Sequence, residues 1–291
     1  MLATIRAEDS QCSLKSDLER INAVISESVG FYNLDSMVFD RYRQWVINVS
    51  MQALEAQRDT EDRIKLLHAM GILYHGQGQH EAASKYLKEC LDERVAYFGE
   101  GSREHLDSMN AIASLYADQG RIDEALPLFF SCLQKRLNLL GDQHIDTLES
   151  MNSLATLMLK GSRNRFPEAQ RLFEDCVKYR KAGLGGMHPD TLTSINNLGK
   201  LYMKRSLYSE AEEMLTECLE KRRKVLGDQH PDTLQSINDL AVLFRRWKNL
   251  EKAQPLHEDC LTRRKAVLGP DHLDTLQSIN NLARLCNDLG D

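Results

Sequence analysis

Apolar residues recur with helical spacing in pairs of segments along most of the chain, and the segment around residue 196 shows the pattern clearly. One set falls on a single face of a helix that turns by about 100° per residue. It consists of Leu192, Ile195, Leu198, Gly199 and Tyr202. A second segment follows with the same spacing in Ala211, Leu215, Cys218 and Leu219. The pattern predicts two amphipathic helices joined by a turn.

This pair of segments is one copy of an internal repeat. The string Asp-Thr-Leu begins at Asp146, Asp190, Asp232 and Asp274, so successive copies lie 44, 42 and 42 residues apart. Counting back in steps of 42 places two earlier copies at Glu104 and Asp62. A helix pair of this size cannot bury its apolar face alone, whereas stacked pairs can. We therefore expect an all-α solenoid. Its repeats are expected at 62–103, 104–145, 146–189, 190–231 and 232–273, with a partial copy at 274–291.

Polar residues and glycines mark the predicted helix ends. An Asp at the repeat start is followed three residues later by Glu149, Gln235 or Gln277, which is typical of a capping box. Glycines follow the second helices, where a left-handed residue ends a helix. They are Gly141, Gly227 and Gly269. Histidines precede the helix starts, and we expect them to cap the helix or hold the turn. They are His144, His188, His230 and His272.

The two ends of the chain depart from the repeat. In residues 1–61, apolar residues from Leu14 to Val29 and from Met37 to Val49 predict a helical hairpin that caps the first repeat. At the other end, Asp291 falls where the turn of the sixth copy should lead into its second helix. We expect either that the chain continues or that its last helix is an imperfect cap.

Composition and charge narrow the functional classes. The net charge of −6 disfavours a general nucleic-acid binder, which needs a basic excess. The chain shows no signal peptide and no stretch near the ~18 apolar residues of a membrane span. Its seven cysteines include no C-x-x-C pair, which fits neither a disulfide framework nor a zinc site. We expect a cytoplasmic protein with reduced thiols, no cofactor, no nucleic-acid partner and no membrane insertion.

The repeat also resembles a known family. The unit Leu-x-x-Ile-x-x-Leu-Ala/Gly-x-x-Tyr, followed by Glu-Ala and a leucine, is similar to the tetratricopeptide repeat, although longer than its usual length of about 34 residues. With the string "LGDQHPDTLxSINxLA", residues 62–291 resemble the repeat domain of kinesin light chains.

This resemblance implies a fold, a binding mode and a class of partner. The fold is a right-handed superhelix whose concave groove takes cargo peptides, often with acidic and aromatic residues. Asparagines of the first helices would hold the peptide backbone. Kinesin motor machinery is one possible partner, although residues 1–61 lack the sustained heptads by which kinesin light chains join the motor.

One polar arc of the first helices is the candidate binding surface. Asparagine occupies one register position in five copies, at Asn110, Asn152, Asn196, Asn238 and Asn280, and a second asparagine follows at Asn197 and Asn281. An amide both donates and accepts hydrogen bonds, so a ladder of amides can hold an extended peptide whatever its side chains. The alternative is that each asparagine bonds only its own scaffold.

Charge on this arc changes along the chain. Earlier copies place Asp107 and Asp118 there, whereas later copies place basic residues. These are Lys160, Lys200, Lys204, Arg245, Arg246 and Arg284. A basic half-groove would favour acidic peptide segments and speed their encounter. The alternative is a set of solvated helix ends. Basic runs on the second helices, "KRRK" from Lys221 and "RRK" from Arg263, indicate a solvated outer face.

The remaining reactive residues do not assemble an active site. Five cysteines recur one per copy and are typical of small buried packing residues. They are Cys90, Cys132, Cys176, Cys218 and Cys260. His257 and Cys260 lie one helical turn apart, but no third catalytic partner can be named. We expect no catalytic or metal-binding residue and a non-enzymatic adaptor that binds extended, acidic peptides. The alternative is the sensor or assembly arm of a larger signalling protein whose enzymatic domain lies outside this chain.

Overall fold

The described part of the chain is helical throughout. The computed structural model describes residues 60–161 and 163–290, and within these ranges it contains helices and no strand. This confirms the predicted all-α fold. The predicted N-terminal hairpin lies outside the described residues, apart from its last two positions. No helix of the described ranges is long and apolar enough to span a bilayer.

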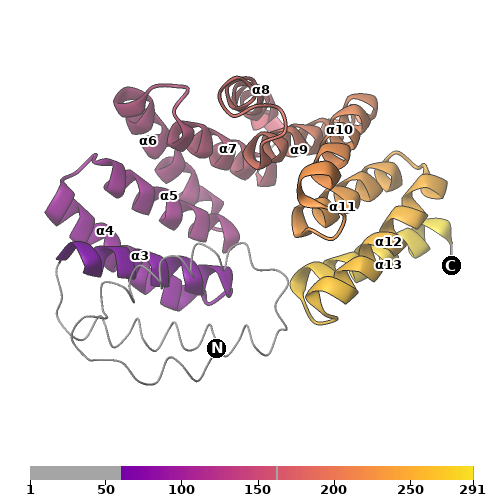
Figure 1. The fold of residues 1–291 in the computed structure, drawn as a ribbon, viewed down its shortest axis with the longest axis horizontal. Coiled ribbons are helices and arrows are strands. Elements are labelled where there is room, and N and C mark those ends of the chain that lie inside the picture. Colours follow the sequence, from indigo (N-terminus) through magenta and orange to yellow (C-terminus); the bar gives the residue numbers. More distant parts are fainter. Residues whose placement is uncertain (1–59, 162, 291) are drawn as a thin grey trace. The chain divides into compact units, whose positions relative to one another are not determined.

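The described residues form two compact units that divide after Gln119. The described part of the first unit, from Thr60 onward, contains three helices, α3 (Thr60–Gly76), α4 (His80–Phe98) and α5 (Arg103–Asp118), and α4 packs against both others (Figure 1). Because this division falls inside the predicted repeat 104–145, the limits of the single repeats stay a prediction.

The second unit is a succession of packed helices. Each helix packs against the next from α6 to α13, in the order that Figure 1 shows. These helices are α6 (Ile122–Leu140), α7 (Ile145–Lys160), α8 (Phe166–Gly183), α9 (Pro189–Lys204), α10 (Tyr208–Leu226), α11 (Pro231–Arg246), α12 (Leu250–Leu268) and α13 (Leu273–Leu289), with a short 3-10 helix η1 (Arg163–Arg165) before α8. The first helices of the repeats here are α7, α9, α11 and α13.

A small residue permits the close packing within a helix pair. A Cβ atom added at Gly199 of α9 would lie 2.9 Å from Cγ and Cδ2 of Leu215 on α10, which is closer than van der Waals contact allows. Leu215 is completely buried, and it belongs to an apolar core that includes Leu234 and Ile237 of α11. The periodic apolar residues of the sequence therefore form the seams between helices, as a solenoid requires.

Histidine, rather than aspartate, caps the first helices of the second unit. Nδ1 of His144 accepts a hydrogen bond from the backbone N–H of Asp146 at 3.2 Å. The same bond recurs at His188, His230 and His272, at 3.1 to 3.2 Å. Capping by histidine is confirmed and the capping box is wrong, because each helix begins one residue before the aspartate. The aspartates instead lie in the first turn, where a negative charge is favoured by the helix dipole.

The glycines that end the second helices have the expected positive φ, at 86° for Gly141 and 87° for Gly227 and Gly269. A side chain there would strain the backbone. These glycines therefore fix the points at which the second helices turn into the next repeat.

Buried arginines hold the end of each second helix to the helix that follows. Nη1 of Arg222 donates to the backbone oxygen of Asp232 at 2.8 Å and to Oγ of Ser236 at 2.9 Å. The same pair of bonds recurs at Arg94, Arg136, Arg180 and Arg264. Arg222 is 3% exposed and Arg264 1% exposed. The solvated face predicted for the basic runs is therefore wrong at these two positions.

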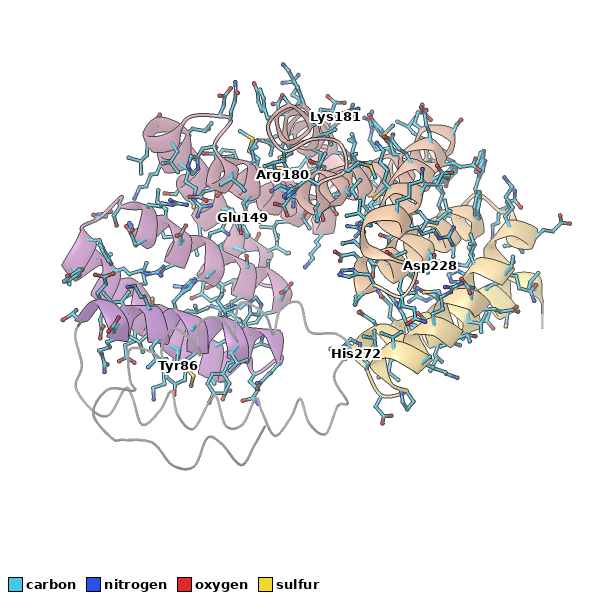
Figure 2. All side chains as sticks on the ribbon, in the orientation of Figure 1. Tyr86, Glu149, Arg180, Lys181, Asp228 and His272 are labelled. Carbon is cyan, nitrogen blue, oxygen red and sulfur yellow. The ribbon has the colours of Figure 1, made fainter. Side chains whose placement is uncertain are left out.

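Two neighbours on α8 show this division. Arg180 is buried and bonds to α9, whereas the next residue, Lys181, is exposed (Figure 2). A basic run on a second helix therefore contains one structural arginine and several solvated cations. Charge alone does not separate the two kinds in the sequence, but the fixed register of the arginine does.

The five recurring cysteines are completely buried, as expected. Four thiols, at Cys90, Cys132, Cys218 and Cys260, lie 3.6 to 3.8 Å from the serine hydroxyl that the arginine also contacts. Burial raises the pKa of the Cys176 thiol to about 12. A thiol with so high a pKa is a poor nucleophile, because the thiolate is the reactive form.

Candidate functional site

The predicted asparagine ladder joins neighbouring first helices of the second unit. Nδ2 of Asn197 on α9 donates to Oδ1 of Asn152 on α7 at 3.2 Å. Asn196 donates to Oδ2 of Asp239 on α11 at 2.8 Å. Asn281 on α13 donates to Oδ1 of Asn238 at 2.8 Å. We call these three bonds the rungs. Residues that occupy equivalent places in successive repeats share a register position. Each rung joins a residue of one first helix to a residue of the next first helix that lies one position beyond its own equivalent.

The rungs give these asparagines the scaffold role that the sequence left as the alternative. Asn196 and Asn238 are only 4% and 3% exposed, and Asn196 also accepts a bond from Oγ of Ser236 at 3.3 Å. Direct contact with a peptide stays a prediction. Both polar atoms of the Asn196 amide and Oδ1 of Asn238 already take part in hydrogen bonds.

Two predicted asparagines have other surroundings. Asn280 is exposed on α13. In the first unit Asn110 is 7% exposed, and its Oδ1 has no hydrogen-bond partner among the described residues. The five asparagines at this one register position therefore differ in burial and bonding, although the sequence makes them look alike.

Basic residues lie two helical turns beyond the rungs. Lys204 follows Asn197 by seven residues and Arg246 follows Asp239 by seven, so each returns to nearly the same helical face. Nζ of Lys204 donates to the backbone oxygen of Leu159 on α7. Lys200 lies one turn before Lys204 and is half-buried, while Arg246 is exposed. We call Lys200, Lys204 and Arg246 the cation cluster.

No internal carboxylate neutralises the cation cluster. Among residues 60–161 and 163–290, no Asp or Glu lies within ion-pair distance of its three side chains. The residue of α9 at the register position facing Arg246 is Met203, an apolar side chain that is 7% exposed. Burial lowers the pKa of Lys204, and the charges of Arg246 and Lys200 lower it further. The positive charges of Lys200 and Arg246 therefore both act on Lys204.

The remaining predicted basic residues differ from this cluster. Arg245 donates from Nη1 to Oδ2 of Asp288 on α13 at 2.8 Å, and Lys248 lies 3.4 Å from the other oxygen of that carboxylate. Hydrogen bonding from Arg245 lowers the pKa of Asp288. Lys160 and Arg284 are exposed at other places on α7 and α13. The structure therefore brings together three of the six predicted cations and gives a fourth an internal partner.

Two carboxylates that bond to predicted site residues, Asp239 and Asp288, were not predicted from the sequence. Asp239 takes the register position of Asn197 and Asn281, and Asp288 takes that of Lys204 and Arg246. Both could have been found by comparing whole register columns rather than by searching for one residue type.

Nothing in the described residues resembles a catalytic centre. His257 is 1% exposed, neither ring nitrogen has a hydrogen-bond partner, and burial and the charge of Arg245 lower its pKa to about 4. The neighbouring Cys260 thiol contacts the backbone oxygen of Leu234 and the hydroxyl of Ser278. No group of three or more His, Cys, Asp or Glu side chains is placed to hold a metal ion in the described ranges.

Tetratricopeptide repeat families match residues 104–182 and 190–266, and residues 64–107. No curated protein sequence matches the chain.

Solved structures match over most of the chain. A putative kinesin light chain from Podosopora anserina with nearly identical TPR-like repeats is 24% identical, with 70% of this chain and 96% of that chain covered and a TM-score of 0.56. BtubC (BKLC) from P. vanneervenii is 17% identical, with 90% and 94% covered and a TM-score of 0.60. NprR in complex with its cognate peptide NprX is 13% identical, with 99% and 77% covered and a TM-score of 0.68.

Proposed function

Because the chain belongs to the tetratricopeptide repeat family, we propose that it is an adaptor that holds extended, acidic segments of other proteins against the first helices of its second unit. The repeat fold is that of a protein-interaction scaffold. The predicted resemblance to tetratricopeptide repeats is confirmed, and a solved putative kinesin light chain shares the fold.

The cation cluster is the observation that carries the proposal. Lys200, Lys204 and Arg246 gather on one part of a helical surface, and no carboxylate in the described part of the chain pairs with them. Like charges that are held together in this way repel one another, and an anionic ligand relieves the repulsion. An acidic segment of a partner supplies that charge.

The related folds support an extended peptide as the ligand. NprR, which shares this fold, binds its cognate peptide NprX. An extended segment lying across α9 and α11 would reach cations of both helices. We also propose that the chain acts without catalysis, because burial raises the pKa of the Cys176 thiol and lowers the pKa of His257, which makes the first a poor nucleophile and the second a poor base.

A charge-reversal experiment tests the proposal. Lys200→Glu combined with Arg246→Glu leaves Lys204 in its contact with Leu159 and avoids Arg245, which pairs with Asp288. We expect this variant to bind a pool of degenerate Asp- and Glu-rich peptides at least about tenfold more weakly than the unaltered protein, as loss of ~1.4 kcal/mol implies. Binding is measured as peptide retained on the immobilised protein.

The matched control makes the same charge change elsewhere. Lys224→Glu combined with Lys265→Glu alters exposed cations of the second helices α10 and α12. We expect it to retain the peptide pool within about twofold. Equal losses in both variants would show that net charge, not this site, attracts the peptides, and the proposal would then be wrong.

A further inference from the structure

A rung holds together the two helices from which the cation cluster projects. The bond from Asn196 to Asp239 joins α9 to α11 at 2.8 Å. Lys204 and Arg246 lie about two turns further along these same helices, roughly 11 Å at 1.5 Å per residue. Lys200 and Lys204 are four residues apart and therefore neighbours on the surface of α9. The three charges are thus presented by a braced pair of helices.

The cluster carries more charge than one carboxylate can balance. It has three formal positive charges, and no carboxylate of the described ranges pairs with them. At the equivalent position one repeat later, between α11 and α13, Asp288 pairs with Arg245. A carboxylate brings one negative charge. A phosphate monoester brings about 1.5 to 2 at pH 7. The larger charge suits a cluster in which burial first, and then the charges of Arg246 and Lys200, lower the pKa of Lys204.

The donors of the cluster also outnumber the oxygens of a carboxylate. One N–H of Lys204 bonds to Leu159, which leaves its other two N–H groups available. Arg246 is exposed and offers a planar fork of donors that suits phosphate as well as carboxylate. Lys200 adds a third cation one turn away. A phosphate group has three acceptor oxygens for these donors, and a carboxylate has two.

We propose that the cation cluster binds a phosphorylated serine or threonine of the extended partner, so that phosphorylation of the partner strengthens its binding. This inference rests on the proposed function, since the phosphate must be delivered by a bound segment. The ligand chemistry is a phosphate monoester dianion held by one arginine and two lysines from two adjacent first helices.

Three peptide pools that differ at one position test the inference. Each pool has degenerate flanking residues and a fixed central serine, aspartate or phosphoserine. We expect the immobilised protein to retain the phosphoserine pool at least about tenfold better than the serine pool and several-fold better than the aspartate pool. The second pKa of a phosphate monoester is about 6, so the advantage over aspartate should shrink when the pH falls from 7.5 to about 5.

Neutral variants locate the effect. Lys200→Gln combined with Arg246→Gln should remove the preference for phosphoserine, whereas Lys224→Gln combined with Lys265→Gln should keep it. Circular dichroism establishes that all variants retain their helices. Inorganic phosphate is added as a competitor, and we expect it to displace the phosphoserine pool only at concentrations far above those of the peptides.

The possible failures are distinguishable. Equal retention of the aspartate and phosphoserine pools would overturn this inference and leave the acidic-peptide function standing. Retention of none of the pools would overturn both. Displacement by phosphate at peptide-like concentrations would show a free-phosphate site and would likewise overturn the inference.

Discussion

The two halves of the first helices in the second unit use polar residues in opposite ways. Near the middle of α9 and α11, Asn196 and Asp239 are buried and bonded to each other. Two turns later, Lys204 and Arg246 occupy the same helical face, but no carboxylate of the described residues lies within ion-pair distance of them. Polar residues on this face can therefore either have a bonding partner within the protein or remain available to bind a ligand. The difference lies in whether the facing residue is a polar partner or an apolar side chain such as Met203.

Asn196 and Asp239 are buried with polar partners, whereas the buried ring of His257 has none among the described residues. Its ring lies in the core without a hydrogen bond, and its pKa is lowered from the ordinary 6.5 to about 4. As the pH falls, the unfolded chain therefore binds this proton first. We expect the free energy of unfolding to fall between about pH 6.5 and pH 4, by up to about 3 kcal/mol from this group alone.

His257→Leu isolates that effect. The equivalent residue on α10 is Leu215, so leucine restores the apolar residue of the repeat. Urea unfolding of the variant should show a smaller loss of stability in this pH window. His68, whose pKa is also lowered to about 4, is present in both proteins and cancels in the comparison. Identical pH profiles for the two proteins would refute a neutral, unpaired His257.

Removing one rung tests whether the buried hydrogen bonds between first helices stabilise the fold. Asn196→Ala takes away the donor to Asp239 and the acceptor for Ser236, and it leaves the Asp239 carboxylate 5% exposed with one bond fewer. We expect a loss of about 2 kcal/mol in the free energy of unfolding, measured from urea unfolding followed by circular dichroism. The control is Asn280→Ala, at the same register position but exposed, which should change stability by less than about 0.5 kcal/mol. Similar losses at both sites would mean that the rung contributes nothing specific.

Removing a carboxylate that pairs with two cations tests whether unpaired cations of this surface attract acidic peptides. Asp288→Asn releases Arg245 and Lys248 from their shared carboxylate. We expect the variant to retain the acidic peptide pool about two- to threefold better, since more cations are free to meet it. Asp271→Asn makes the same charge change in the turn before α13 and should have no such effect. A gain in both variants would indicate long-range attraction rather than a local site.

The sequence predicted the fold well and the site only in part, for a physical reason. Helical period and repeat spacing determine which residues are buried between helices, so the apolar seams followed directly. The rungs join residues 43 or 45 positions apart, one more than the repeat spacing, because neighbouring first helices meet with an offset of one residue. That offset depends on how the helices stack, and one chain's pattern does not contain it. The bond from Asn196 to Asp239 therefore could not be predicted, and buried asparagines looked like free ones.

Burial of the arginines escaped prediction for a related reason. In "KRRK", Arg222 and Arg223 carry the same charge, yet Arg222 is 3% exposed and Arg223 is exposed at the surface. What separates them is a backbone oxygen and a serine hydroxyl on the next helix, placed 10 and 14 residues later. A bonding partner contributed by the following helix becomes visible only once that helix is in place.

The buried thiols can be used to detect local separation of the helices around them. Each second helix has one cysteine without solvent contact, and α13 has an exposed one, Cys286. A thiol reagent can therefore modify Cys286 at once, but it can modify Cys176, Cys218 or Cys260 only when the surrounding helices separate. The order in which these thiols become modified would rank the repeats by how often each one opens, without adding a probe to the chain.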